Sequence, residues 1–292
     1  MEGFGLSGTT FAVVLAVIAR AVPESKRSMA LGIGSAAGSL GQFVLVPAGN
    51  SFVVQYGWSS TIFLLACMLA LVIPLSYLLS GKQEVSGPEQ TLKAALSEAA
   101  GHSGYVYLTA GFFVCGFQVT FIGIHLPAYL TDIGLSSSVG AWALSLVGLF
   151  NLVGTLLAGY LGNRFLKKNI LSVIYFGRAV AIAIFVLVPP SVASALIFAC
   201  SMGILWLATI PLTSGIVGQV FGSRYLGTLF GFVFLSHQIG SFLGVWMGGV
   251  LFDVTQSYEV VWWVCAGLGV MAAVLHLPIN EDPIKRAVQA AH

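Results

Sequence analysis

The sequence predicts an all-α integral membrane protein, and three observations support this class. Of the 292 residues, 58% are hydrophobic and 8% are charged, whereas a soluble domain carries about 25% charged residues. The mean hydropathy is +0.96, so there are too few polar side chains to cover a surface that faces water. Apolar runs of about 20 residues recur along the chain, which is the length of helix that crosses the hydrocarbon core of a bilayer. The net charge of +2 is too small to indicate nucleic-acid binding.

Helices are the predicted spanning elements, because backbone groups in lipid must be hydrogen-bonded within the chain. Nine segments are predicted to span the membrane: 3–22, 28–50, 59–80, 104–130, 136–162, 169–188, 191–217, 224–250 and 257–278. The long polar stretch 81–103 is predicted to be a cytoplasmic linker with a short amphipathic piece. It separates the remainder of an N-terminal half, 1–80, from a C-terminal half of six spans, 104–278, and from a tail, 279–292.

The cations are distributed unevenly among the connections between these spans. Ten of the twelve lie in alternate connections and in the tail: Lys26, Arg27, Lys82, Lys93, Arg164, Lys167, Lys168, Arg224, Lys285 and Arg286. The other connections hold no Lys or Arg, although they hold Asp132, Asp253 and Glu259. By the positive-inside rule, the first set is predicted to be cytoplasmic in the cell membrane, together with the C-terminus.

An internal repeat is indicated by two arginines that each open a span from the same side, Arg27 and Arg224. Behind them, small residues recur at intervals of about four, and such stripes let helices approach closely in lipid. The predicted packing glycines are Gly34, Gly38, Gly227, Gly231, Gly240 and Gly244. The repeat suggests duplicated halves, although three spans precede the linker and six follow it.

The chain resembles the major facilitator superfamily. Residues 159–169, "GYLGNRFLKKN", are similar to the family's G-x-L-x-D-R-x-G-R/K loop, and residues 19–38, "ARAVPESKRSMALGIGSAAG", resemble its passage from fourth to fifth span. Residues 125–154 and 236–263 resemble a branch of bacterial carriers related to monocarboxylate and oxalate–formate transporters. The resemblance covers essentially the whole chain. It implies that the nine spans correspond to helices 4–12 of a twelve-helix fold, so we expect the first three to be missing from a truncated sequence.

The resemblance also implies a gating role for the loop, in which Arg164 bonds to carboxylates or helix-end carbonyls of neighbouring spans. Gly159 and Gly162 would let the two connected spans pack tightly at the turn. The family usually has Asp where this chain has Asn163, which predicts a weaker latch. Relatives in this branch often carry an Arg near Thr155, and this chain does not. The alternative is that the loop cations only anchor the chain on the positive side. The other gating candidates are Arg27, Arg224 and His125.

Polar residues deep in membrane spans are costly and mark functional candidates. The candidate substrate-binding residues are Gln118, Asn151, His237, Gln238, Trp206, Thr209 and Arg20. The first four lie near the middle of their spans. Trp206 and Thr209 share one side of the seventh span with Thr213, and Pro211 is predicted to break the helix there. By the resemblance, Arg20 faces the central path. Interhelical hydrogen bonds, aromatic packing or snorkelling are the alternative explanations, and Arg178 is predicted to pair or to snorkel.

The predicted function is secondary transport of a small solute by alternating access around a site at the bilayer midplane. By the branch resemblance, the solute is an organic anion such as a monocarboxylate, and His237 is the titratable group if a proton is coupled. An enzyme is not expected, because H-E-x-x-H, G-x-S-x-G and P-loop motifs are absent. The alternatives are a truncated, non-transporting membrane protein and a carrier of a drug or sugar. No cofactor, metal or nucleic acid is expected, and the chain is predicted to be a monomer in the lipid bilayer.

Overall fold

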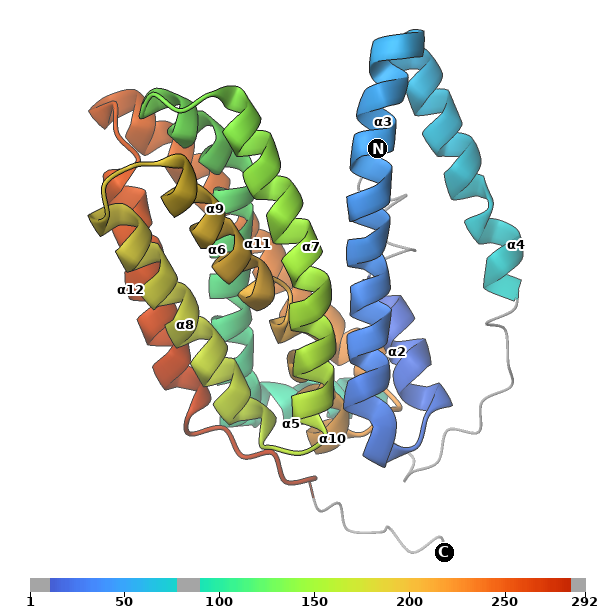
Figure 1. Ribbon diagram of the computed structural model, residues 1–292. Coiled ribbons are helices and arrows are strands. Elements are labelled where there is room, and N and C mark those ends of the chain that lie inside the picture. Colours follow the sequence, from blue (N-terminus) through green and yellow to red (C-terminus); the bar gives the residue numbers. More distant parts are fainter. Residues whose placement is uncertain (1–10, 78–89, 285–292) are drawn as a thin grey trace, which may run out of the picture.

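The computed structural model describes residues 11–77 and 90–284, and within them every regular element is helical. Most of the described chain forms one bundle (Figure 1). Its helices are α6 (Ser103–Asp132), α7 (Ser137–Gly162), α8 (Lys167–Leu187), α9 (Val192–Leu205), α10 (Thr209–Phe221), α11 (Leu226–Thr255) and α12 (Glu259–His276). Helices α9 and α10 together make one crossing.

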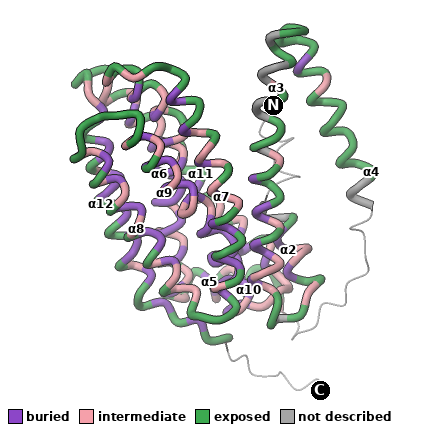
Figure 2. The backbone as a smooth tube through the Cα atoms, in the orientation of Figure 1, coloured by how far each residue is buried: buried purple, intermediate pink, exposed green. Residues whose placement is uncertain are grey.

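The N-terminal elements lie to one side of this bundle (Figure 1). They are α2 (Phe11–Ala21), the 3-10 turn η1 (Glu24–Lys26), α3 (Arg27–Ala70) and α4 (Val72–Tyr77). Helix α3 reverses direction at Gly57, whose φ of 78° is open to glycine but costly for residues with a side chain. The limb before Gly57 lies against α7, and the limb after it is turned away and almost wholly exposed (Figure 2).

The predicted spans agree with the structure, with two corrections. Eight helices of the described residues are long and apolar enough to cross a membrane. The remaining predicted span, 3–22, is the first in the chain. It begins outside the described residues, and its described part is α2. The sequence predicts that residues 51–58 connect the spans 28–50 and 59–80. The structure instead keeps these residues helical up to the reversal at Gly57. The predicted span 191–217 is interrupted between α9 and α10.

The linker contains the amphipathic piece that its sequence predicts. Helix α5 (Leu92–Gly101) buries Ala95 and Ala99, and the Thr91 hydroxyl caps its start by accepting a hydrogen bond from the Ala94 N–H at 3.2 Å. Residues 78–89 of the linker lie outside the described part.

Glycines decide which helices touch backbone to backbone. A Cβ added to Gly240 would overlap the carbonyl oxygen of Phe113, and one added to Gly244 would lie 2.5 Å from that of Phe117, so α11 packs directly on α6. Of the other predicted packing glycines, Gly34 meets the side chain of Ile18, whereas Gly231 faces open space. Gly38 is exposed and Gly227 is half-buried.

All the basic connections that the structure describes meet at one end of the bundle, which we call the basic end. There the Tyr225 hydroxyl donates to the Gln90 carbonyl at 2.7 Å, and the Ile284 N–H donates to the Val220 carbonyl at 3.1 Å. These contacts join the linker, the α10–α11 connection and the segment after α12. Among the described residues, the basic connections therefore lie at one end of the bundle, as the sequence predicts.

A matched pair of glycines on α11 tests the backbone contact with α6. Gly240→Ala should lower the unfolding free energy by about 1–3 kcal/mol, because the new Cβ has no room. Gly249→Ala should leave it unchanged, because that position faces open space on the same helix. Thermal unfolding of the detergent-solubilised protein measures both, and equal melting temperatures for the two variants would contradict the close packing.

Candidate functional site

The site is built around the interruption between α9 and α10, where residues 206–208 leave the helical hydrogen-bond pattern. Pro211, the third residue of α10, has no N–H and so cannot continue the pattern of the preceding turn. The interruption is buried, since Trp206 is 7% exposed and Thr209 is 0% exposed. Backbone groups freed at this depth need partners from other helices, because water and lipid do not supply them there.

Arg178 of α8 supplies the donors for the freed carbonyl groups. Its Nε and Nη2 atoms donate to the Leu205 carbonyl at 3.0 and 2.7 Å, and Nη2 also donates to the Trp206 carbonyl. Its Nη1 donates to Gln118 Oε1 at 3.3 Å. The side chain is fully buried, and all of these acceptors are neutral. The planar fork of a guanidinium suits this role, since one side chain serves two successive carbonyls.

Asn151 of α7 holds the other side of the interruption. Its Oδ1 accepts from the Leu207 N–H at 2.9 Å, and its Nδ2 donates to the Ser39 hydroxyl of α3 at 2.7 Å. On the opposite flank, Gln118 Nε2 donates to the Cys265 carbonyl of α12 at 2.8 Å. A continuous hydrogen-bonded chain therefore runs from α3 through α7, the interruption, α8 and α6 to α12.

A second group of polar side chains lies beside this chain, around the Cys115 thiol of α6. The thiol is 3.3 Å from the Thr209 hydroxyl, and the next residue, Gly116, packs against the backbone of His237. His237 is 8% exposed, with its Nδ1 3.2 Å from Gln238 Oε1 and 3.4 Å from the Ser241 hydroxyl. Its Nε2 atom is buried without a hydrogen-bond partner, as is the Thr213 hydroxyl. Unpaired buried groups are uncommon in structural interiors and indicate places where a ligand or water can bind.

The structure brings together five of the seven predicted substrate-binding residues: Gln118, Asn151, His237, Trp206 and Thr209. Gln238 contacts this group, with Oε1 3.2 Å from His237 Nδ1, although its side chain is exposed. Arg20 is exposed and lies outside the group. The predicted helical stripe from Trp206 through Thr213 is wrong, because the interruption separates Trp206 from α10. The prediction for Arg178 gave pairing or snorkelling, and the structure shows pairing. Sequence reasoning missed Ser39 and Cys115, which carry no signal that separates them from other small residues in spans.

The predicted role of two gating glycines needs a correction. Gly159 and Gly162 do not bring α7 against α8, the helix that follows them. A Cβ on Gly159 would lie 3.0 Å from the Gly32 Cα of α3, and one on Gly162 would overlap the Ser28 hydroxyl. These glycines therefore bring α7 against α3, which joins the N-terminal elements to the bundle at the basic end.

After α7, the contacts to neighbouring segments that the sequence predicts for Arg164 are made by Lys167 and Lys168 instead. Arg164 is exposed in the loop after α7, with its guanidinium carbon 4.4 Å from the centre of the Tyr160 ring of that helix. Lys167 instead donates to Gln219 Oε1 at 2.7 Å, and Lys168 donates to the Leu277 carbonyl at 3.0 Å. The two lysines are thus more than positive anchors, because they bond to α10 and to the segment after α12.

Glu281 completes this end of the bundle. Its Oε1 accepts from the backbone N–H of Lys168 at 2.6 Å, which places a carboxylate at the start of α8, where it is favoured. Its Oε2 lies 3.8 Å from Lys167 Nζ, and its carbonyl accepts from Gln219 Nε2 at 3.0 Å. The segment after α12 therefore ties α8 to α10.

The remaining gating candidates lie at the two ends of the bundle. Arg27 Nε donates to the Ala19 carbonyl at 3.3 Å, which ties the start of α3 to α2. Arg224 is half-buried, 5.8 Å from the Tyr225 ring. His125 lies toward the other end, with Nε2 3.1 Å from the Val245 carbonyl of α11. Asn163 lines a small pocket at the basic end.

Comparison with known proteins assigns a family. A family model described as "Major Facilitator Superfamily" matches residues 1–244 and 108–292, which together cover the chain. An uncharacterized MFS-type transporter of Bacillus subtilis, YcxA, is 28% identical over 266 residues, covering 87% of this chain and 64% of that protein. Monocarboxylate transporter 12 of Rattus norvegicus is 23% identical over 290 residues, covering 86% of this chain and 59% of that protein. The chain therefore spans less than two thirds of the length of these relatives.

Solved structures show the same fold. The Escherichia coli fucose:proton symporter FucP matches with a TM-score of 0.70 and 16% identity, covering 91% of this chain and 72% of that one. The proton:xylose symporter XylE matches with a TM-score of 0.66 and 16% identity, covering 89% of this chain and 65% of that one.

Replacing Arg178 tests the hydrogen-bonded chain at the interruption. Arg178→Met should lower the unfolding free energy by about 1–3 kcal/mol for each carbonyl left unpaired, because Leu205 and Trp206 lose their donors. Arg178→Lys should recover only part of this loss, since an ammonium lacks the planar fork. Arg164→Met removes a cation from the exposed loop and is the control. Thermal unfolding that is equally affected by Arg164→Met and Arg178→Met would contradict the role of Arg178.

Proposed function

We propose that this chain, which belongs to the major facilitator superfamily, carries a small organic anion such as a monocarboxylate across the membrane by alternating access. Proteins of this family are multi-pass transporters of small molecules and not enzymes. The chain covers less than two thirds of its curated relatives, so the activity of the whole protein is part of the proposal.

The observation that carries the proposal is the interrupted helix α9–α10. Transporter sites form where helices are discontinuous near the bilayer midplane, because freed backbone groups can then face a solute. Here the interruption lies in the described bundle between α7 and α8, and its groups are held by Asn151 and Arg178. Two buried polar groups on α10 and on α11, the helix that packs against it, have no hydrogen-bond partner: the Thr213 hydroxyl and His237 Nε2. We propose Gln118, Asn151, Trp206, Thr209 and His237 as the residues that shape the site.

The charges favour an anion over a cation. Arg178 is a buried cation whose hydrogen-bond acceptors are all neutral. In the described spans the carboxylates lie at helix ends, as Asp132, Asp253 and Glu259 do. A carrier for a cation would need negative charge near its site, and a carrier for an anion would need the reverse. Relatives named as monocarboxylate transporters support the carboxylate class, whereas the likeness to the fucose and xylose symporters supports the fold alone.

The orientation and the division into halves are part of the proposal. The basic end is assigned to the cytoplasm by the positive-inside rule, together with the C-terminus. Residues 1–80 then contribute to one half, 81–103 form the linker, 104–278 form the other half, and 279–292 form the tail. The contact between Gly32 and Gly159 joins the halves at the cytoplasmic side, so its opening would be one step of the cycle.

Counterflow tests the substrate class directly. Proteoliposomes loaded with unlabelled lactate or acetate should accumulate the labelled anion several-fold above protein-free liposomes. Labelled fucose and xylose are the alternative substrates in the same assay. Accumulation of a sugar without accumulation of either carboxylate would overturn the anion assignment.

His237 tests proton coupling. In His237→Gln, an amide keeps hydrogen-bonding ability but cannot titrate, so uptake driven by an inward proton gradient should fall to the level without a gradient. Counterflow, which needs no net proton movement, should persist. His102→Gln is the control, because His102 lies between α5 and α6 at the basic end. His237 would be excluded from proton coupling by either of two results. One is wild-type uptake that is equal with and without the proton gradient, and the other is uptake by His237→Gln that still rises with the gradient.

A further inference from the structure

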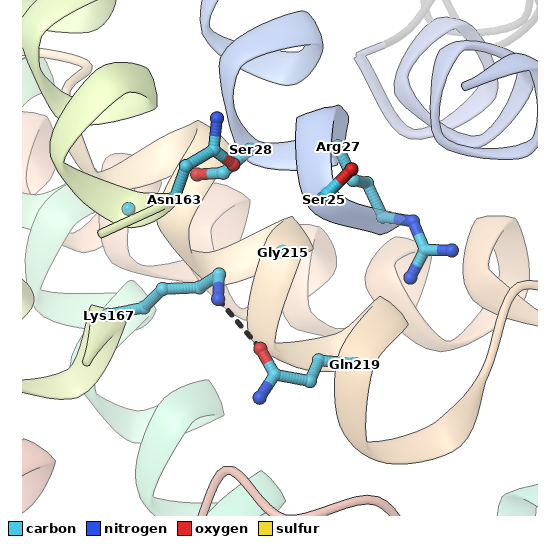
Figure 3. A pocket seen from close by; sticks show the side chains of 8 residues that line it. Ser25, Arg27, Ser28, Asn163, Lys167, Gly215 and Gln219 are labelled. Atoms are coloured by element: carbon cyan, nitrogen blue, oxygen red, sulfur yellow. Dashed lines mark hydrogen bonds between the residues drawn. The ribbon is translucent and has the colours of Figure 1, made fainter. Parts of the chain in front are cut away.

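A small pocket at the basic end combines features of an anion site. It has a volume of about 90 Å³, and its lining includes Ser25, Ser28, Asn163, Lys167 and Gln219 (Figure 3). None of the lining residues is acidic. Its walls come from both sides of the α3–α7 contact, because the two serines belong to η1 and α3, while the others belong to the loop after α7, to α8 and to α10.

The Ser28 hydroxyl is the first observation that indicates a ligand. The side chain is 2% exposed, and its oxygen has no hydrogen-bond partner. Serines deeper in α3 bond to the preceding turn, as the Ser35 hydroxyl does with the Leu31 carbonyl at 2.9 Å. Ser28 is the second residue of α3 and has no full α-helical turn before it. A buried hydroxyl left unpaired typically costs about 1–3 kcal/mol of folding free energy. A ligand that accepts a hydrogen bond from Ser28 would remove this cost.

Lys167 is the second observation. Its stem lies over Gly215, whose missing side chain leaves room for it, since an added Cβ would be 3.2 Å from Lys167 Cδ and Cε. Figure 3 shows the ammonium group in the pocket, where it donates to Gln219 Oε1. The Glu281 carboxylate is 3.8 Å away and does not line the pocket. The positive charge of Lys167 therefore borders a pocket whose lining holds no carboxylate, which favours an anion as the occupant.

We propose that this pocket binds a small oxyanion, either a carboxylate or inorganic phosphate, between Lys167 and the Ser28 hydroxyl, with the Asn163 amide as a further donor. A cation would be repelled by Lys167. An occupant would touch both α3 and the α7–α10 side, so it would favour the arrangement in which these walls are together. Bound anion would thus stabilise the closed basic end. Only its identification with the transported carboxylate rests on the proposed function.

Protection of an introduced thiol tests the site. Ser25 is exposed at the edge of the pocket, so Ser25→Cys gives a reporter in a chain whose Cys67 and Cys200 are replaced by Ala. Its modification by a water-soluble maleimide is timed while acetate, lactate or inorganic phosphate is titrated against chloride at constant ionic strength. At about twice the dissociation constant, two thirds of the sites are occupied, so the rate should fall roughly threefold.

Neighbouring lysines provide the matched control. Lys167→Met should abolish the protection, whereas Lys168→Met removes an equal charge from the next residue, which does not line the pocket, and should retain it. Ser28→Ala should weaken protection without lowering the melting temperature, because the hydroxyl it removes has no partner. Protection that survives in Lys167→Met, or rates that are equal in chloride and in all three oxyanions, would overturn the proposal.

The titrations also distinguish the two sources of anion, and together with counterflow they separate the pocket from the transport function. Protection by acetate or lactate alone would support the transported carboxylate as the ligand, and equal protection by phosphate would support a site for cytosolic oxyanions. Protection without carboxylate counterflow would support the pocket and count against the proposed function. Counterflow without protection would retain the function and overturn the pocket.

Discussion

The structure depends on one constraint, which is that backbone groups in an apolar interior must find partners. The interruption between α9 and α10 frees the carbonyls of Leu205 and Trp206 and the N–H of Leu207. Arg178 serves the carbonyls and Asn151 serves the N–H. Because these partners belong to α8 and α7, the interruption also fixes how three neighbouring crossings sit against each other. A break in one helix thus becomes the centre of a network across the bundle.

This network reaches the N-terminal elements through the hydrogen bond from Asn151 to Ser39 of α3. The same two helices, α3 and α7, meet again at the basic end, where Gly32 and Gly159 touch backbone to backbone. A rigid separation of α3 from α7 would break both contacts. In the proposed transport cycle, this geometry would couple the state of the basic end to the interrupted helix near the proposed site.

The charged groups at the basic end bond to specific neighbouring helices and do not simply form a positively charged surface. Glu281 accepts from the start of α8 and from Gln219 of α10 through different atoms, and Lys167 lies between them. These contacts leave the pocket beside Ser28 without a lining carboxylate. Arg164, which matches the family's loop motif, lies outside this arrangement and stacks on Tyr160. The residue that matches the motif and the residues that make the contacts are therefore different.

The sequence by itself determined the helical membrane class, the position of most spans and the separation of cations to one end, because lipid restricts composition and charge residue by residue. It also located the buried polar residues Gln118, Asn151 and His237, since each is conspicuous in an apolar run. Only the tertiary structure decided what they bond to. That Arg178 serves carbonyls 27 and 28 positions away, and that Gly159 packs on α3 rather than α8, depends on which helices are neighbours. Such neighbours are set by packing across distant segments, which no local pattern encodes.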